Sequence, residues 1–339
     1  MKTTVTLVAA ALCAALLPAT AQAAPVKCFG EPATIVGTNE DDQIEGTGGR
    51  DVIVGLDGDD TINGLGGDDI LCGSPGMDQL FGGYGDDRMN GNLGIDRVSG
   101  GIEELEEEKA SAPDDGDDLA RGGPGRDNFI IGHTDGAAFV DLGKGIGKAP
   151  GTGRDRIQGI EDTSGTDKGD KLFGSDAANI IYGWDGKDLI TGRGGDDSLV
   201  GNYDGGTGDD DTIYGGSGDD GIYGDTGEYH GGSDLLYGGP GADRIYGEIL
   251  AYVDYAYPDE IHGGPGPDEI WGDYASDDEG DIFEDVGEPD VITGGGGNDT
   301  MHGMAGNDSL DGGAGNDFAE GGEDYDRCVD SEEVVDCEE

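Results

Sequence analysis

Aspartates recur every nine residues along much of this chain, in a pattern suited to binding a hard cation. In residues 37–99 each of these repeating aspartates comes five positions after a glycine and two positions before a large apolar residue, as in Gly55, Asp60 and Ile62. Calcium accepts carboxylate and carbonyl oxygens in flexible geometry, whereas magnesium requires a tight octahedron and keeps its waters. Neither histidine nor cysteine recurs with this period, which favours calcium over zinc.

We therefore predict several calcium ions as the cofactor, bound by aspartates of the regular and interrupted repeat blocks. The predicted ligands are Asp51, Asp60, Asp69, Asp78, Asp87, Asp96, Asp170, Asp188, Asp197, Asp211, Asp220, Asp290, Asp299, Asp308, Asp317 and Asp326. Asn179 stands at an aspartate position of the second block and keeps an oxygen without the charge, so we expect a weaker site there.

The nine-residue unit also dictates the elements that position these aspartates. Its first six residues are rich in glycine and form a turn, and its last three alternate polar, apolar, polar, as in residues 61–63, which is typical of a very short strand. Two units make a lap of about 18 residues, and stacked laps make an all-β, right-handed parallel β-roll. Aspartates such as Asp60 and Asp78 then lie one above the other, where their charges repel by about 1–4 kcal/mol per pair unless a cation lies between them.

One unit carries a resemblance to a known family. Residues 82–90 read GGYGDDRMN, which resembles the RTX (hemolysin-type) calcium-binding nonapeptide, G-G-x-G-x-D-x-U-x, where U is a large apolar residue. The resemblance implies a β-roll with calcium between successive turns and folding that depends on calcium. The composition alone, with 72 Gly, 12 Pro and a net charge of −58, is typical of a disordered chain. Both descriptions hold together if the chain is disordered without calcium and folded with it.

The chain divides into five predicted segments. Residues 1–23 have a lysine, a short apolar run and a final Ala-Gln-Ala, which is typical of a secretory signal peptide and predicts an extracellular protein. The remaining segments are 24–99, with the N-terminal segment and first repeat block; 100–164, with an acidic insert, two repeats and a spacer; 165–284, with the second and interrupted blocks; and 285–339, with the third block and a C-terminal cap.

Four cysteines follow the predicted signal peptide, and an even number in an exported chain indicates two disulfides. Three connectivities are possible. We favour Cys28–Cys72, because Cys72 occupies an outward position near the incoming N-terminal segment, and Cys328–Cys337, which would close the acidic tail as a clip. Each of these disulfides would covalently fix one end of the roll. A zinc site is the alternative, although the spacing lacks the usual C-x-x-C pair.

Several stretches leave the register. Residues 103–108 are acidic and predict a short helix or a solvated loop, and residues 131–164 resemble the spacers between RTX blocks, where we expect longer strands that continue the roll. Excursions such as 248–253 and 273–284 interrupt the later repeats. Tyrosines gather in this region and allow two interpretations, an aromatic strip that binds a glycan or cell-wall polymer, or an ordinary strand surface, which we favour. These tyrosines are Tyr214, Tyr223, Tyr237, Tyr246, Tyr252, Tyr255 and Tyr257.

The sequence argues against several classes of function. The four histidines are scattered and none lies in H-E-x-x-H, and the nucleophile elbow, the P-loop and the EF-hand pattern are absent, so we expect no enzymatic activity. An excess of 76 acidic over 18 basic residues excludes nucleic acid as a partner. The hydrophobic domain of RTX toxins is missing, which argues against membrane insertion.

We thus predict a secreted calcium-binding repeat protein with a structural or interaction role outside the cell. The alternatives are a calcium sink without a macromolecular partner, a calcium-dependent adhesin for cell-wall or extracellular glycans and, less favoured, a polysaccharide-active β-solenoid enzyme. An N-terminal signal peptide departs from the uncleaved C-terminal export signal of many RTX proteins, and resembles secreted repeat-only proteins instead.

Overall fold

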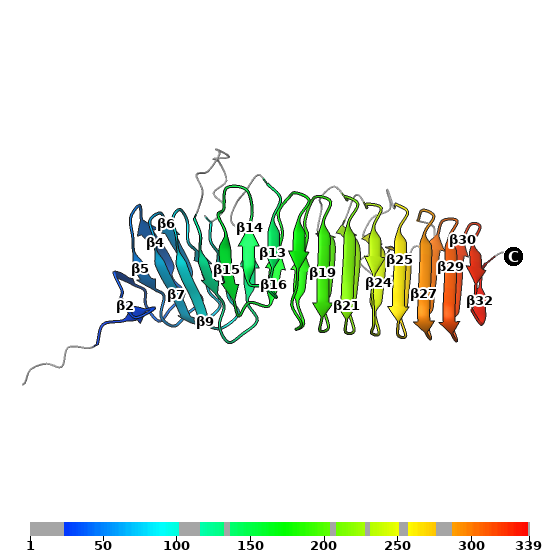
Figure 1. Cartoon of the computed structure of the whole chain (residues 1–339), viewed down its shortest axis with the longest axis horizontal. Coiled ribbons are helices and arrows are strands. Elements are labelled where there is room, and N and C mark those ends of the chain that lie inside the picture. Colours follow the sequence, from blue (N-terminus) through cyan, green and yellow to red (C-terminus); the bar gives the residue numbers. More distant parts are fainter. Residues whose placement is uncertain are drawn as a thin grey trace, which may run out of the picture.

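Two long β-sheets lie face to face along an elongated molecule, with the N-terminal and C-terminal repeats at opposite ends (Figure 1). The computed structural model describes residues 24–101, 116–131, 136–203, 208–227, 231–250, 257–275 and 287–337. The predicted signal peptide and the acidic residues 103–108 lie outside these ranges. Nowhere in these ranges is there a helix long and apolar enough to cross a membrane.

Sheet I has 16 strands and sheet II has 14. In spatial order sheet I contains β3 (Ile35–Val36), β5 (Val52–Val54), β7 (Ile70–Pro75), β9 (Arg88–Leu93), β11 (Leu119–Arg121), β15 (Asp155–Gln158), β14 (Ile146–Lys148), β13 (Phe139–Asp141), β17 (Lys171–Phe173), β19 (Leu189–Gly194), β21 (Thr212–Ser217), β23 (Leu235–Tyr237), β25 (Glu260–Pro265), β27 (Val291–Gly297), β29 (Ser309–Gly315) and β31 (Arg327–Val329).

Sheet II contains, from the N-terminal end, β4 (Gln43–Thr47), β6 (Thr61–Leu65), β8 (Gln79–Phe81), β10 (Arg97–Ser99), β12 (Asn128–Ile130), β16 (Asp162–Ser164), β18 (Ile180–Tyr182), β20 (Ser198–Tyr203), β22 (Gly221–Gly227), β24 (Arg244–Leu250), β26 (Glu269–Ala275), β28 (Thr300–Ala305), β30 (Phe318–Glu323) and β32 (Glu333–Val335). A separate antiparallel pair, β1 (Lys27–Cys28) and β2 (Glu31–Pro32), precedes both sheets.

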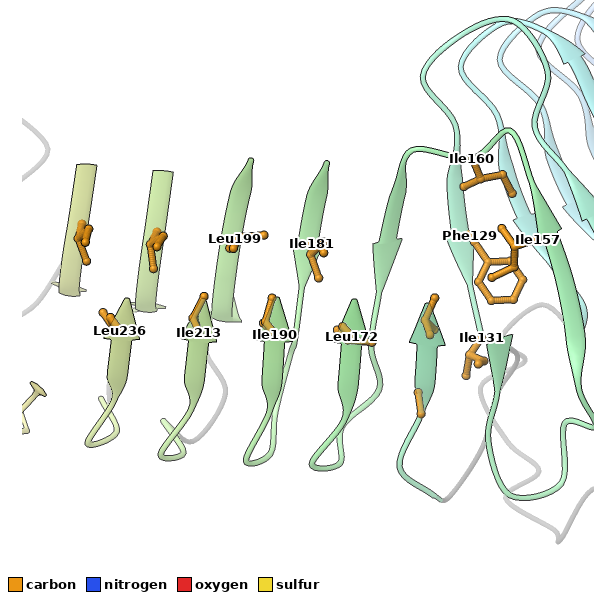
Figure 2. Close-up of a cluster of buried hydrophobic side chains, with 14 of the residues drawn as sticks. Phe129, Ile131, Ile157, Ile160, Leu172, Ile181, Ile190, Leu199, Ile213 and Leu236 are labelled. Atoms are coloured by element: carbon orange, nitrogen blue, oxygen red, sulfur yellow. The ribbon is translucent and has the colours of Figure 1, made fainter. Parts of the chain in front are cut away.

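In the repeat blocks the chain alternates between the sheets, so that each strand pairs in parallel with the strand one lap later. Ile62 of β6 pairs with Leu80 of β8, for example, and the central apolar residues of both sheets are fully buried. Figure 2 shows such residues projecting from the two sheets into one narrow core, with Leu172 and Ile190 on one side and Ile181 on the other. Each buried side chain of this size stabilises the fold by about 1.5–3 kcal/mol. The predicted all-β parallel roll is confirmed.

The spacer differs from our expectation of longer strands that continue the roll. Its strands have three or four residues, and β14 is antiparallel to both β13 and β15 because the chain doubles back within sheet I. The core is wider here, and the side chains of Phe129, Ile131, Ile157 and Ile160 fill it (Figure 2). The physical reason is that residues 139–158 lack the glycine register that closes a regular turn.

Both predicted disulfides are present, and each fastens one end of the roll. Cys28–Cys72 joins the N-terminal segment to β7 across 44 residues, and Cys328–Cys337 closes the C-terminal tail. Beside the first disulfide, the Phe29 ring lies 4.3 Å from the guanidinium of Arg88, which adds a cation–π contact to the N-terminal cap.

Candidate metal centre

Two ladders of buried carboxylates run along the two edges of the roll, where the chain passes between the sheets. At the edge that we call the regular edge, the chain passes from sheet I to sheet II, and in every repeat block the aspartate follows the register glycine by five positions, as Asp60 follows Gly55. At the opposite edge, which we call the inserted edge, several turns are longer. The turn from Gly272 to Asp290 is one example.

All of the aspartates predicted as ligands are buried on these ladders. Those on the regular edge are Asp60, Asp78, Asp96, Asp197, Asp220, Asp299 and Asp317. Those on the inserted edge are Asp51, Asp69, Asp87, Asp170, Asp188, Asp211, Asp290, Asp308 and Asp326. The ladders also contain buried aspartates beyond the predicted set, which are Asp118, Asp127, Asp155, Asp234, Asp243, Asp259 and Asp268. Asn179 takes its predicted place on the regular edge.

Each ladder is held together by a repeated hydrogen bond between laps. The amide N–H of Asp60 donates to Oδ1 of Asp78 over 3.0 Å, and the amide of Asp234 donates to Oδ1 of Asp259 over 2.7 Å. The same bond recurs whether the lap has 18 residues or many more. One carboxylate oxygen of each aspartate is therefore committed to the backbone of the neighbouring lap.

The second carboxylate oxygen, Oδ2, is buried without a hydrogen-bond partner in most of the ladder aspartates. These aspartates are Asp60, Asp69, Asp78, Asp96, Asp127, Asp188, Asp197, Asp211, Asp220, Asp234, Asp243, Asp259, Asp268, Asp290, Asp299, Asp308 and Asp317. Asp51 and Asp170 differ, because their Oδ2 atoms accept N–H bonds from Thr47 and Thr166. A buried anionic oxygen without a partner is costly, so these rows of oxygens are suited to binding a cation.

The register glycine leaves the space in which oxygens from two laps converge. A Cβ atom added to Gly192 would lie 2.0 Å from Oδ2 of Asp197 and 2.6 Å from the carbonyl oxygen of Gly215, one lap away. The same close approach recurs at Gly238, where a Cβ would meet Asp243 and Gly263. Only glycine is compatible with this cradle of hard oxygen atoms. The residues present thus fit calcium, whose coordination combines carboxylates with backbone carbonyls.

The donor set also disfavours zinc. Within the ranges that the structure describes, no point is surrounded by three His, Cys, Asp or Glu side chains. Backbone carbonyls must therefore complete each site, as calcium allows and structural zinc does not.

Burial raises the pKa of most ladder carboxyls, and most strongly beside the long turns of the inserted edge. On the regular edge burial raises the pKa of Asp243 and Asp268 to about 7, against the lowering effect of the amide hydrogen bonds that each accepts. On the inserted edge burial, followed by repulsion from Asp234, raises the pKa of Asp211 to about 10. The pKa of Asp259 also lies well above its usual range through burial and the charges of its neighbours. The inserted edge is therefore the more strained in the absence of cations.

Arginines replace the cation where the spacer interrupts the regular edge. Arg126 makes a bidentate pair with Asp162, at 2.7 and 2.9 Å. Arg193 makes another with Asp141, at 2.8 and 2.9 Å, and Lys144 adds a third contact to the same carboxylate. Although burial opposes it, these hydrogen bonds lower the pKa of Asp141 to about 2. The sequence reasoning missed these pairs, because the partners are far apart in the chain.

The outward tyrosines form stacked ladders on the strand surfaces. The Tyr246 ring lies between Tyr223, with centroids 5.4 Å apart, and Trp271, at 4.5 Å, and the rings are within 4° of parallel. On the other sheet Tyr237 lies between Tyr214 and His262 in the same way. Both faces of these inner rings contact neighbouring rings, which leaves their edges for solvent or partners. Tyr252 and Tyr255 lie outside the described residues.

The family model described as the RTX calcium-binding nonapeptide repeat (4 copies) matches this chain at residues 36–71, 73–102, 164–199, 206–228, 230–249, 255–278 and 287–328, which together make up more than half of the sequence. The chain belongs to the RTX calcium-binding nonapeptide repeat family. Its repeats imply calcium binding, in agreement with the carboxylate ladders, and its disulfides fit an extracellular location. No curated protein matches the chain.

Proposed function

We propose that this RTX protein is a secreted roll that folds when calcium enters its two carboxylate ladders, with a non-catalytic structural or interaction role outside the cell. The observation that carries the proposal is the row of buried Oδ2 atoms without hydrogen-bond partners along both edges. When calcium is bound, it supplies the positive charge that these oxygens lack. The aspartates and the register glycines hold the oxygens in place for it.

The magnitudes favour folding that depends on calcium. Each buried and unpaired carboxylate costs several kcal/mol after relaxation, whereas a whole domain is stable by only about 5–15 kcal/mol. A few uncompensated carboxylates therefore cancel the net stability of the fold. Calcium that binds only the folded chain reverses this balance by mass action, and extracellular modules with dissociation constants of about 0.1–1 mM suit such a role.

The histidines that the structure describes support a non-catalytic role. His262 and His302 lie in the aromatic ladders and contact the exposed carboxylates of Glu260 and Glu320, at 3.1 and 2.9 Å. Each thus continues a strand surface rather than facing a nucleophile. His133 and His230 lie outside the described residues.

Glycan binding is the second candidate, and one surface favours it. Trp184 and Tyr203 are exposed at 38% and 47%, and their rings meet almost perpendicularly with centroids 5.9 Å apart, beside Tyr182. Unlike the stacked tyrosines, these rings offer free area to a sugar. A pull-down on cell-wall glycans in calcium, with Trp184→Ala as the comparison, tests this prediction. Equal retention of both proteins would remove this surface as the binding site.

The central proposal is tested by counting bound ions and measuring the size of the chain together. Native mass spectrometry of the purified protein should show several calcium ions bound, and size-exclusion chromatography should show contraction when calcium replaces EDTA. Magnesium at the same concentration should produce neither change. Calcium binding without contraction would overturn folding on calcium, and the absence of bound calcium would overturn the proposed function itself.

A further inference from the structure

The inserted edge carries a row of acidic side chains that the nonapeptide pattern does not contain. In three of its long turns the residue directly after the register glycine is acidic, namely Asp225, Glu248 or Asp273, whereas two others have Gly101 or Asn202 there. Strand pairing places each of the acidic residues beside the next, with Asp225 opposite Glu248 and Glu248 opposite Asp273. We call Asp225, Glu248 and Asp273 the second row. The sequence reasoning assigned two of them to excursions, although their fixed place after the glycine was a signal.

Second-row carboxylates are buried, and each uses only one oxygen to hold the backbone. Asp225, Glu248 and Asp273 are exposed by 2% or less. One oxygen of each accepts a backbone N–H from the end of a long turn, from Gly232, from Tyr257 over 3.0 Å and from Glu288 over 3.1 Å, respectively. The other oxygens, Oδ1 of Asp225, Oε2 of Glu248 and Oδ1 of Asp273, accept no hydrogen bond from an amide or hydroxyl donor, and the carboxyl groups of Glu248 and Asp273 lie within hydrogen-bonding reach of each other.

The conformation of the long turns explains why these side chains are buried. In several short turns of the same edge the residue after the register glycine has a left-handed backbone, as at Leu65 and Trp184, with φ of 71° and 72°. Asp225, Glu248 and Asp273 do not have a left-handed backbone, and their strands β22, β24 and β26 continue two residues beyond them. Glu248 also packs against the preceding long turn, since a Cβ on Gly231 would lie 1.6 Å from its Oε1.

The second row lies within electrostatic reach of the ladder. Asp234 is repelled by Asp225, Asp259 by Glu248, and Asp290 by Asp273. Each of these ladder aspartates has its own unpartnered Oδ2. The described basic side chains do not pair with the second row; those that form ion pairs do so elsewhere.

We propose that Asp225, Glu248 and Asp273 are additional calcium ligands, so that each of these three long turns supplies two carboxylates to the cation where a regular turn supplies one. The inference rests on the calcium binding proposed above and extends it to residues outside the repeat consensus. Added carboxylates tighten oxygen-ligand sites for calcium. The long turns therefore bind calcium before the regular turns do, and they order the middle of the roll first.

The decisive variant replaces the second row by isosteric amides, Asp225→Asn, Glu248→Gln and Asp273→Asn together. Its matched control, Glu40→Gln, Glu45→Gln and Asp57→Asn, removes the same charge from exposed positions of the first block. Both are titrated with calcium as full chains, and far-UV circular dichroism and isothermal calorimetry are recorded. We expect the triple amide variant to need about tenfold more calcium at its midpoint, because its sites lose ligand charge. The control should shift by less than about twofold, as exposed charges are largely screened.

The isosteric amides distinguish two roles for the second row: carboxylates that bind calcium, and carboxyl groups that only accept hydrogen bonds from the turns. If the second row were uncharged and purely structural, the amides would keep the hydrogen bonds and would fold at equal or lower calcium, which would overturn the inference. If the triple variant does not fold, single variants and their near-ultraviolet spectra at ~10 mM calcium, above the range of extracellular modules, provide the same comparison. A wild-type chain that ignores calcium would contradict the proposed function, whereas an unshifted variant beside a responsive wild type would contradict this inference alone.

Discussion

Both edges of the roll bury a row of carboxylates, but the turns that carry these carboxylates differ in length between the two edges. On the regular edge the turns of the repeat blocks are uniform, and burial raises the pKa of carboxyls such as Asp243 only to about 7. On the inserted edge the turns lengthen, further carboxylates are buried, and the pKa of Glu248 rises to about 11 through burial and then repulsion from Asp273. Insertions have thus concentrated negative charge on one edge, while the opposite edge keeps the repeat unchanged.

This difference shows which part of the repeat the fold requires. The interlap hydrogen bond from amide to Oδ1 survives in long turns, as from Asp259 to Asp290 over 2.8 Å. The cradle formed by the register glycine also survives, since a Cβ on Gly247 would lie 2.0 Å from Oδ2 of Asp259. Turn length therefore varies, whereas the register glycine and a side-chain oxygen five or more positions after it are kept, including at Asn179.

Replacing a register glycine by alanine should strongly destabilise the calcium-loaded roll on both edges. Gly238→Ala on the regular edge and Gly247→Ala on the inserted edge would each place a Cβ against an aspartate oxygen and a neighbouring carbonyl. We expect each to destabilise the calcium-loaded roll by about 1–3 kcal/mol from overpacking, with loss of an ion in addition. Gly296→Ala is the control, because its nearest atom is 4.0 Å away. Thermal unfolding in calcium measures the effect, and similar melting of all three variants would show that the cradle is not required.

Removing the arginine that replaces calcium in the spacer should destabilise the chain even at saturating calcium. Arg193→Met leaves the buried Asp141 with Lys144 alone. We expect a loss of about 2–3 kcal/mol, below the 3–5 kcal/mol typical when a buried pair loses its only partner. Lys144→Met, at a mostly exposed side chain, should cost under about 1 kcal/mol. Chemical denaturation in calcium compares them, and full rescue of Arg193→Met by added calcium would contradict a calcium-independent spacer.

Acid should partly replace calcium in the metal-free chain. The raised pKa values mean that protonated carboxyls stabilise the folded state below their unfolded pKa near 3.8, and that this stability is lost as pH rises through the folded values. For Asp78 and Asp197 the folded value is about 7. In EDTA we therefore expect a modest gain of β signal in circular dichroism between pH 7.5 and 5. A spectrum that loses β signal over this interval would contradict the assigned direction.

The repeat explains how much of this molecule is predictable from its sequence. The nine-residue period predicts the strands, the row of buried apolar residues and both carboxylate ladders, because each unit contains its own turn, strand and aspartate. The Arg193–Asp141 pair was not predictable, since no local pattern reports a contact made across 52 residues. The antiparallel β14 forms a local hairpin with β13, in a spacer that was expected to continue the parallel roll. Glu248 was overlooked for another reason, because the residue after the register glycine is outward in short turns and changes its environment only when the turn lengthens.

The most direct test of this account is a far-UV circular dichroism titration of the metal-free chain with calcium and, separately, with magnesium. The account predicts a cooperative gain of β signal in calcium at about 0.1–1 mM, the range of extracellular modules, and little gain in magnesium. A chain that is already fully β-structured in EDTA, or one that remains unfolded in ~10 mM calcium, would contradict the claim that cations in the carboxylate ladders hold the roll together.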